Sequence, residues 1–355
     1  MSKLNIAVIY GGANSEHDVS KASAATVVGA LSPNKYNIIP VYITKDGRWL
    51  LNDGGPGELL SPNIECFASP AILSPERGKR SLMRIVGSKV RSIPIDIVFP
   101  VLHGRMGEDG TIQGLCELSG IPCVGSGTAA SAAAMDKDFT KALAHRLGIP
   151  QTPYLTYRAY ELSEKEVVCK RVRQELGYPC FVKPANSGSS VGISKVRNKT
   201  KLLCAIEEAL KHDTKIIIER AVKGRELECS ILGNGDINTI VSVVGEVIPD
   251  GEFYTYDAKY NNKASKTIIP ALIPQAVTEQ VRRLALQIFR GIDARGMARA
   301  DFFYSEDENT YFNEINTIPG WTNISMYPML LNSTGLTTPE ITDKLIDLAL
   351  TNLQT

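Results

Sequence analysis

The sequence predicts a mixed α/β protein that opens with a parallel, Rossmann-like sheet. The apolar run LNIAVIY (residues 4–10) is followed by Gly11 and Gly12, and an Ala-rich apolar stretch then continues to Leu31. Strand, glycine turn and helix in this order begin a doubly wound α/β unit. Late in the chain, MARADFFY and TYFNEIN flank the polar turn SEDEN and predict an antiparallel strand pair. A chain of 355 residues has room for two or three domains.

The composition indicates a soluble cytoplasmic protein that binds neither nucleic acid nor membranes. The net charge is +1, and no stretch approaches the roughly 20 apolar residues of a membrane span. The short apolar run near the N-terminus is typical of a first strand and not of a signal peptide. Seven cysteines without a CxxC pattern indicate reduced thiols, and the four histidines lack zinc-ligand spacing.

The N-terminal third contains two more predicted buried strands, NIIPVYIT (37–44) and IDIVFPVL (95–102). Residues 52–90 are rich in Gly, Pro, Ser and charge, so we expect a variable surface excursion there without a motif. Glu16 stands at the entrance of the first helix, where it either caps the helix or binds a ligand in a cleft. His103 follows the third strand at its carboxyl end, the favoured ligand position of open sheets, although a structural role is an equal alternative.

The centre of the chain predicts a phosphate-binding hairpin. A helix is expected over 128–148, and then CFVK and VGISKV form two strands joined by a loop of serines and Gly188. Such a loop can offer N–H and hydroxyl donors to phosphates, with Lys183 and Lys137 as nearby cations. The Walker pattern and the GxGxxG pattern are both absent. A flexible surface hairpin is the alternative.

A nucleoside site and a lid are weaker predictions from the following segments. Residues 215–232 read as strand, turn and strand, with Glu219 and Glu226 on either side of Val222. Residues 246–270 have little periodicity and predict a long lid loop carrying Lys259 and Tyr260. Helices are predicted over 202–213, 277–293 and 339–350.

The late strand pair carries the strongest functional signal. Arg299 and Asp301 share a face of the first strand, and Glu314 and Asn316 share a face of the second. If the two faces coincide, two carboxylates and an amide oxygen form a site suited to Mg²⁺ and nucleotide phosphates. A solvated strand face is the alternative. The turn at Gly320 could bind a developing negative charge through its backbone N–H.

Taken together, the motifs resemble those of the D-alanine–D-alanine ligases of the ATP-grasp superfamily. They are GGANSEHDVS, HGRMGEDGTIQG, MDKD, VKPANSGSSVGISKV, IIIERAVKGRE, YDAKY, GMARADFF and NEINTIPGWTNISMYP, in the family's order along almost the whole chain. The resemblance implies three domains: an N-terminal substrate domain (1–126), a central ATP-grasp domain (127–220) and a C-terminal ATP-grasp domain (221–355).

The resemblance also implies roles for individual residues. The metal ligands would be Asp301, Glu314 and Asn316. The ATP contacts would be Lys137, Lys183, Ser190, Glu219, Val222, Glu226 and Lys259. The catalytic set would be Glu16, Ser189, Tyr260, Arg299 and the N–H of Gly320. The substrate contacts would be His103, Ser325 and Met326.

The implied reaction joins two D-alanines through a D-alanyl phosphate, for peptidoglycan precursor synthesis. ATP and Mg²⁺ are the expected cofactors, with Mn²⁺ as a substitute metal and a K⁺ requirement left open, and a homodimer is the expected assembly. D-Serine or D-lactate as second substrate is the alternative within the family, but Tyr260 and Met326 favour D-alanine. A non-catalytic nucleotide-binding protein would be expected to have lost some of Arg299, Asp301, Glu314 and Asn316.

Overall fold

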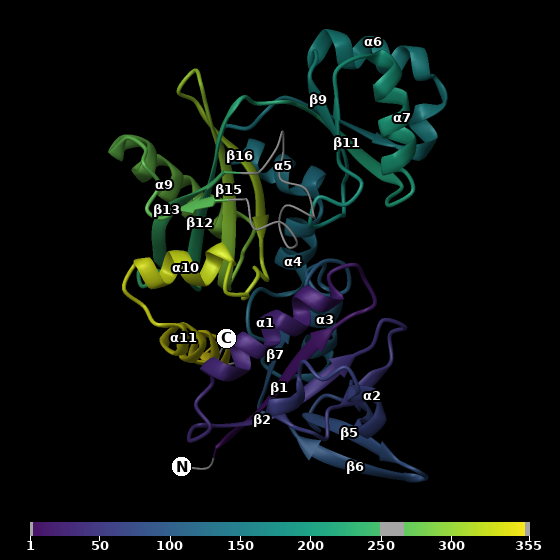
Figure 1. The fold of residues 1–355 in the computed structure, drawn as a ribbon, viewed down its shortest axis with the longest axis vertical. Coiled ribbons are helices and arrows are strands. Elements are labelled where there is room, and N and C mark those ends of the chain that lie inside the picture. Colours follow the sequence, from purple (N-terminus) through teal and green to yellow (C-terminus); the bar gives the residue numbers. More distant parts are fainter. Residues whose placement is uncertain (1–2, 249–265, 352–355) are drawn as a thin grey trace.

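The computed structural model describes residues 3–248 and 266–351, which form three β-sheets with helices packed on their faces. The N-terminal sheet has seven strands, the central sheet four and the C-terminal sheet five. In Figure 1 the N-terminal part occupies the bottom, the central part the upper right and the C-terminal part the left. None of the helices in the described ranges has the length and hydropathy needed to span a bilayer.

The N-terminal sheet has the strand order β6-β5-β4-β3-β2-β1-β7. Its elements are β1 (Leu4–Gly11), α1 (His17–Ala30), β2 (Tyr36–Ile43), β3 (Trp49–Leu51), a 3-10 turn (Pro56–Glu58), α2 (Ile64–Phe67), β4 (Ser69–Leu73), β5 (Ser81–Val86), β6 (Lys89–Pro94), β7 (Ile97–Val101) and α3 (Thr111–Ser119). Strand β1 is parallel to both β2 and β7, as the doubly wound prediction requires.

Residues 52–90 differ from the irregular excursion that we expected. They contain β4 and β5. Strands β3, β4, β5 and β6 each pair antiparallel with the next and continue the sheet from β2. The sequence signal was weak because the strands are short and separated by turns, and because β6, the edge strand beside β5, exposes polar residues such as Lys89 and Arg91.

The turn after β1 explains how Glu16 reaches the carboxyl edge of the sheet. Gly11 has a φ of +93°, and a Cβ atom there would lie 2.2 Å from the carbonyl oxygen of Ile43, so only glycine fits. The N–H of Gly11 donates to the hydroxyl of Ser20 at 2.8 Å, which ties the turn to the first helix. The helix therefore begins at the edge of the sheet where open α/β folds bind ligands.

The central part begins with two short helices where one was predicted. Helices α4 (Thr128–Met135) and α5 (Lys137–Arg146) are separated by Asp136, which has extended backbone angles. Its carboxylate accepts hydrogen bonds from the N–H groups of Asp138 and Phe139 at 3.1 and 3.2 Å, so Asp136 is an N-cap. The prediction of an uninterrupted helix over 128–148 is therefore wrong, and Lys137 becomes the first residue of α5.

The central sheet has the order β10-β9-β11-β8. Its elements are β8 (Tyr154–Arg158), a 3-10 turn (Ala159–Ser163), α6 (Lys165–Glu175), β9 (Cys180–Pro184), β10 (Ser194–Val196), α7 (Lys199–Ala209) and β11 (Lys215–Arg220). Strands β9 and β10 pair antiparallel, which confirms the predicted hairpin around the serine-glycine loop. Strand β11 pairs with β9, so the lysine at the end of β9 lies beside β11.

The C-terminal sheet has the order β14-β13-β12-β15-β16 and is antiparallel throughout. Its elements are β12 (Gly224–Gly233), β13 (Ile240–Ile248), β14 (Lys266–Ile268), α9 (Gln275–Gly291), β15 (Gly296–Ser305), β16 (Thr310–Asn316), α10 (Met326–Ser333) and α11 (Thr338–Thr351). Both ends of the predicted lid, 246–248 and 266–268, are paired strand residues and not loop. Lys259 and Tyr260 lie outside the described residues.

One hydrophobic core joins the two ends of the chain. It contains β1 and β7 residues such as Val8 and Phe99, together with Trp321, Tyr327 and Leu345 from the C-terminal part. The indole ring of Trp321 meets Phe99 edge-on at 6.4 Å between centroids and lies 5.3 Å from the ring of Tyr327. The segment after β16 is therefore fixed against the N-terminal sheet, beside His103.

Candidate active site

The late strand pair places its four polar residues on one face. Arg299 is the direct partner of Asn316, and Asp301 is the direct partner of Glu314. Direct partners in an antiparallel pair point to the same side of the sheet, so the coincidence of faces that the sequence left open is confirmed. The pairing shifts by one residue after Asp301, where a bulge lets Phe302 pair with Phe312 and return to the core.

Arg299 holds two carboxylates in fixed positions. Its Nε and Nη2 atoms lie 2.7 Å from the two oxygens of Asp301, and Nε is also 2.9 Å from an oxygen of Glu228. Burial lowers the pKa of Arg299, but the charges of Asp301 and Glu228 raise it by more than burial lowers it. The pKa of Arg299 therefore lies well above its usual value. Our sequence reading missed Glu228, although it alternates with Glu226 on one strand and is the partner of Asp301 in the sheet.

The donor set on this face fits a hard divalent cation. Asp301 and Glu314 offer carboxylate oxygens and Asn316 an amide oxygen, and the amide nitrogen of Asn316 lies 3.3 Å from Asp301. The described residues contain no group of three or more His, Cys, Asp or Glu placed to hold a metal. Two carboxylates suit Mg²⁺ when nucleotide phosphates and water supply the remaining oxygens.

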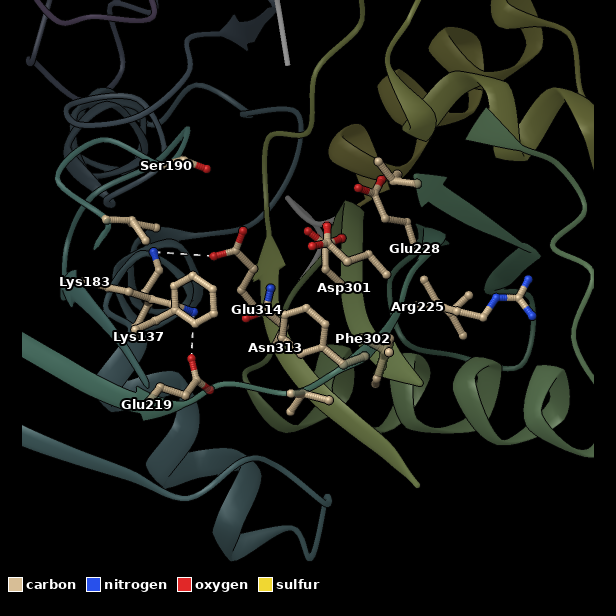
Figure 2. A pocket seen from close by; sticks show the side chains of 18 of the residues that line it. Lys137, Lys183, Ser190, Glu219, Arg225, Glu228, Asp301, Phe302, Asn313 and Glu314 are labelled. Carbon is tan, nitrogen blue, oxygen red and sulfur yellow. Dashed lines mark hydrogen bonds and ion pairs between the residues drawn. The ribbon is translucent and has the colours of Figure 1, made fainter. Parts of the chain in front are cut away.

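A cavity of about 410 Å³ lies between the central and C-terminal sheets and collects most of the predicted ATP contacts. The predicted residues that line it are Lys137, Lys183, Ser189, Ser190, Glu219, Val222, Glu226, Asp301 and Glu314. Figure 2 shows Lys137 directed at Glu314 and Lys183 directed at Glu219, which are ion pairs of 3.4 and 2.6 Å. The cavity wall therefore contains lysines of the central part that are paired with carboxylates of both sheets.

Glu219 forms the most completely buried charge cluster of the cavity wall. One of its oxygens lies 2.5 Å from the ammonium of Lys141 and accepts the hydroxyl hydrogen of Thr152, and the other lies 2.6 Å from Lys183. Burial raises the pKa of Glu219, but the two lysines lower it more, so the pKa falls well below its usual value. Lys141 and Thr152 were not predicted, although Lys141 lies one helical turn after Lys137 on the same face.

The serine-glycine loop contacts the N-terminal turn. The hydroxyl of Ser189 donates to Glu16, and a Cβ atom at Gly188 would lie 2.9 Å from the same carboxylate. Ser189 and Ser190 have φ values of +48° and +61°, a region that non-glycine residues rarely occupy. Two members of the predicted catalytic set, Glu16 and Ser189, are thus in contact.

A second cavity, of about 100 Å³, adjoins the first and shares Ser189, Glu228 and Glu314 with it. The predicted residues around it are Glu16, His103, Ser189, Arg299, Glu314, Asn316, Gly320, Ser325 and Met326. The predicted ATP contacts and the predicted substrate contacts therefore line two cavities that meet at the face of the late strand pair.

His103 is a fixed, buried wall residue of the second cavity. Its Nδ1–H donates to the carbonyl of Ile318 at 3.1 Å, and its Nε2 accepts from the hydroxyl of Ser23 at 2.9 Å. We assign this tautomer because a carbonyl oxygen can only accept. Burial lowers the pKa of His103, while the charge of Glu16 opposes the shift. The imidazole is accordingly neutral near pH 7.

Glu108 is a further carboxyl group of this cavity that we did not predict, although it lies five residues after His103 in the same glycine-rich segment. It accepts a hydrogen bond from the N–H of Gly104 at 2.8 Å. Burial and the nearby charge of Glu16 raise the pKa of Glu108 to about 8. Glu108 therefore carries a proton at neutral pH, and Glu16 faces a neutral neighbour.

The turn after β16 brings Gly320 against Ser325. A Cβ atom on Gly320 would lie 2.7 Å from the hydroxyl oxygen of Ser325, so a side chain there would displace the serine. That hydroxyl accepts from the N–H of Thr322 at 3.0 Å. Ser325 precedes α10, and Met326 begins the helix and is 5% exposed.

Comparisons with known proteins agree over nearly the whole chain. Residues 5–126 match the family model described as the D-ala D-ala ligase N-terminus, and residues 143–347 match the D-ala D-ala ligase C-terminus. The D-alanine–D-alanine ligase of Caldicellulosiruptor bescii is 49% identical over 99% of this chain and 96% of its own length. The D-alanine–D-alanine ligase of Geobacillus kaustophilus is 42% identical over 98% and 95%.

Two solved structures share the fold at moderate identity. The VanG D-Ala:D-Ser ligase of Enterococcus faecalis superposes with a TM-score of 0.89 at 38% identity, covering 98% of this chain and all of the other. The D-alanine–D-alanine ligase of Coxiella burnetii has a TM-score of 0.88 at 35% identity, covering 100% and 96%. The chain belongs to the D-alanine–D-alanine ligase family.

Proposed function

We propose that this protein joins two D-alanines into D-alanyl-D-alanine with hydrolysis of ATP to ADP and phosphate, for peptidoglycan precursor synthesis. The chain is an ATP-dependent ligase with the ATP-grasp fold, and its family uses a divalent metal. The register of the late strands supports the proposal most directly. It brings Asp301, Glu314 and Asn316 to one face with Arg299, where the larger and the smaller cavity meet.

In this proposal the metal is Mg²⁺ and its protein ligands are Asp301, Glu314 and Asn316. When bound, the ion would neutralise charge on the nucleotide phosphates and polarise the transferred phosphoryl group. In the structure these acids are instead paired with Arg299 and Lys137. When nucleotide enters, Lys137 would turn from Glu314 toward the phosphate oxygens.

The larger cavity is the proposed ATP site. Lys137, Lys183 and Ser190 would contact phosphates, and Glu219, Val222 and Glu226 would contact the adenine and ribose. Their common position around one cavity of about 410 Å³ supports these roles. Lys259 would add a contact from the segment between β13 and β14.

The smaller cavity is the proposed acyl-transfer site. Glu16 would hold the ammonium of the first D-alanine, near His103. The carboxylate of this D-alanine would accept the γ-phosphoryl group of ATP and become an acyl phosphate, and ADP would leave. The amine of the second D-alanine then attacks, and phosphate leaves. Arg299 and the N–H of Gly320 would meet the tetrahedral oxyanion, since donors already in place stabilise such charge.

The second D-alanine would be held at the start of α10. The hydroxyl of Ser325 lies at the cavity wall, where it could bind the substrate carboxylate, and Met326 beside it gives an apolar surface. Tyr260 and Ser189 would connect the lid to Glu16. Because acyl phosphates hydrolyse, a closing lid that excludes water has a chemical purpose.

We further propose a cytoplasmic homodimer made of a substrate domain (1–126), a central domain (127–220) and a C-terminal domain (221–355). Mn²⁺ would substitute for Mg²⁺, and a K⁺ requirement is an additional proposal for the assay. Size-exclusion chromatography with light scattering tests the dimer directly.

The deciding experiment measures ADP formation in the presence and absence of D-alanine, with the dipeptide identified by mass spectrometry. We expect ADP release to require both D-alanine and a divalent metal. D-Alanine-independent ATP hydrolysis without dipeptide would contradict the proposal.

D-Serine or D-lactate as second substrate is the competing assignment, and the similarity to VanG makes it worth measuring. Competition of D-serine and D-lactate against D-alanine, with separate quantification of each product, decides between them. The apolar Met326 beside Ser325 supports D-alanine, so we expect D-alanyl-D-alanine as the main product. A preference for D-serine would overturn that assignment.

A further inference from the structure

Lys141 is a buried cation behind Glu219 to which no role has been given so far. It lies in the middle of α5, is 1% exposed, and does not line the nucleotide cavity. Its ammonium lies 2.5 Å from Glu219 and 5.5 Å from the ring centre of Tyr154. Lysines are almost never fully buried unless they are paired, so the position of Lys141 requires a specific reason.

The reason is found in the arrangement of charges around Glu219. One carboxylate is shared by two ammonium groups, because Lys141 contacts one oxygen and Lys183 the other. Glu219 needs only one of these counter-ions for neutrality. The cluster of Lys141, Glu219 and Lys183 thus carries a net charge of +1 beside a cavity whose proposed ligand is strongly negative.

The two lysines differ in what else they can reach. Lys183 lines the nucleotide cavity together with Glu219, whereas Lys141 is enclosed on the far side of the carboxylate. If Lys183 were the only counter-ion, its movement toward a phosphate would leave Glu219 buried and unpaired, which is strongly unfavourable. With Lys141 in place, Glu219 stays paired whatever Lys183 does.

We propose that Lys141 is a positioning residue of the nucleotide site, which holds Glu219 as a permanent counter-ion and so allows Lys183 to direct its ammonium to the phosphates of ATP. The inference rests on the proposed function, because it takes the larger cavity as the ATP site. Lys141 itself touches no substrate and acts only through Glu219.

The test is Lys141→Met, which keeps the length of the side chain but removes its charge. We expect the Kd for MgADP and the KM for ATP each to rise by about ten-fold, because Lys183 is then retained by Glu219. The KM for D-alanine should change by less than about two-fold, since the second cavity is built from other residues. Binding of MgADP is measured by calorimetry without D-alanine.

Two further variants separate charge from packing. Lys141→Arg should restore nucleotide affinity to within about three-fold of the wild type, because it returns the positive charge beside Glu219. Thr152→Val is the matched control: it removes a donor from the same oxygen of Glu219 but leaves both cations, and should change the Kd by less than about two-fold.

A double-mutant cycle with Glu219→Gln tests whether Lys141 acts through the carboxylate. In the Glu219→Gln background no ion pair retains Lys183, so adding Lys141→Met should change the Kd by less than about two-fold. A similar ten-fold loss in both backgrounds would overturn the proposal, and so would an unchanged Kd in the single variant. Where Lys141→Met does not fold, Lys141→Gln is used in the same cycle and judged by the same two outcomes.

These outcomes are distinguishable from failure of the proposed function. If the wild-type protein does not bind MgADP, or forms ADP without D-alanine, the function itself is wrong. If the wild type binds MgADP and makes dipeptide but Lys141→Met binds equally well, only the role of Lys141 is wrong.

Discussion

At the scale of single residues, both acids of the late strand pair have a cation as partner. Asp301 is held by Arg299, and Glu314 lies 3.4 Å from Lys137. A buried carboxylate without a partner is unfavourable, so these ion pairs stabilise the folded site. In the proposed function, metal and nucleotide would replace these cations as partners of the acids.

Glu314 gives a direct test of the metal site. Glu314→Gln should reduce ADP formation by about 100-fold or more. Even the loss of a residue that only hydrogen-bonds to a metal ligand typically reduces metal affinity or activity by about 10- to 100-fold. Raised Mg²⁺ should recover only part of the activity, and circular dichroism should remain that of the wild type. Glu306→Gln, in the exposed turn between the same two strands, is the control with expected wild-type turnover. Equal turnover of the two variants would remove Glu314 from the metal site.

Glu108 makes stability depend on pH in a defined direction. Its pKa is raised from 4.5 to about 8, so between these values the folded state binds more protons than the unfolded state. Stability contributed by the neutral group is present at low pH and is lost as pH rises through about 8. The Tm difference between Glu108→Gln and the wild type should therefore become more favourable to the variant from pH 5 to pH 9. A difference that is constant across this range would contradict the assignment.

The residue-level predictions succeeded where a strand or loop brings its own polar groups together. Alternation put Arg299 on the same face as Asp301 and Glu314 on the same face as Asn316, but only the observed register showed that the two faces coincide. Lys141 and Thr152 could not be assigned in the same way, because their partner Glu219 comes from another element. A buried lysine and an exposed one look alike in a sequence until packing shows which carboxylate is nearby.

At the scale of elements, the break between α4 and α5 positions Lys137 beside the serine-glycine loop. Asp136 caps α5 and also forms an ion pair of 2.6 Å with Lys215, a buried residue of the central sheet. The N–H of Lys137 donates to the carbonyl of Ala185 at 3.0 Å, and the ammonium of Lys137 donates to the carbonyl of Ser187 at 2.7 Å. The helix start is thus tied both to the sheet and to the serine-glycine loop.

Two substitutions at Asp136 separate its roles. Asp136→Ala removes the cap and one carboxylate from Lys215, and should lower the free energy of unfolding by about 3 kcal/mol. Asp136→Asn keeps a capping oxygen but loses the charge, so it should be more stable than the alanine variant by about 1 kcal/mol. Urea denaturation at pH 7 measures both. Equal stability of the two variants would show that the cap contributes nothing.

Element types were predictable from periodicity, and the misses have physical causes. Both late strands, the hairpin and the first helix matched their apolar patterns. The 128–148 segment is Ala-rich on both sides of Asp136, so composition alone did not reveal the cap. Strands β4 and β5 were missed because β4 has only five residues and β5 lacks the alternation of buried and exposed residues that marks a strand.

At the scale of the whole molecule, the N-terminal and C-terminal parts approach closely at two glycines. Gly296 has a φ of +70°, and a Cβ atom there would lie 2.9 Å from the Cα atom of Gly125. Gly125 precedes α4, and Gly296 begins β15, which carries Arg299 and Asp301. This contact helps to set the late strands relative to the N-terminal sheet.

Gly296→Ala should therefore destabilise the protein through both strain and overlap. We expect a loss of about 2 to 3 kcal/mol in the free energy of unfolding, of which about 1 kcal/mol comes from the left-handed backbone. Gly148→Ala is the matched control, because Gly148 has a φ of +67° with nothing within 4 Å of its Cβ position. Chemical denaturation measures the loss in free energy of unfolding for both variants, and the difference between the two losses is the cost of the steric overlap at Gly296. Equal losses would mean that the close approach to Gly125 has no cost.

The core that Trp321 shares with Phe99 has a consequence for how the chain matures during synthesis. The N-terminal sheet leaves the ribosome first, but one of its faces is covered by Trp321, Tyr327 and Leu345, which are made last. Until then, apolar side chains such as Val8 remain without their final neighbours. Nascent chains stalled before residue 320 should consequently recruit chaperones to that face. The chaperones should dissociate when the last helix has been translated.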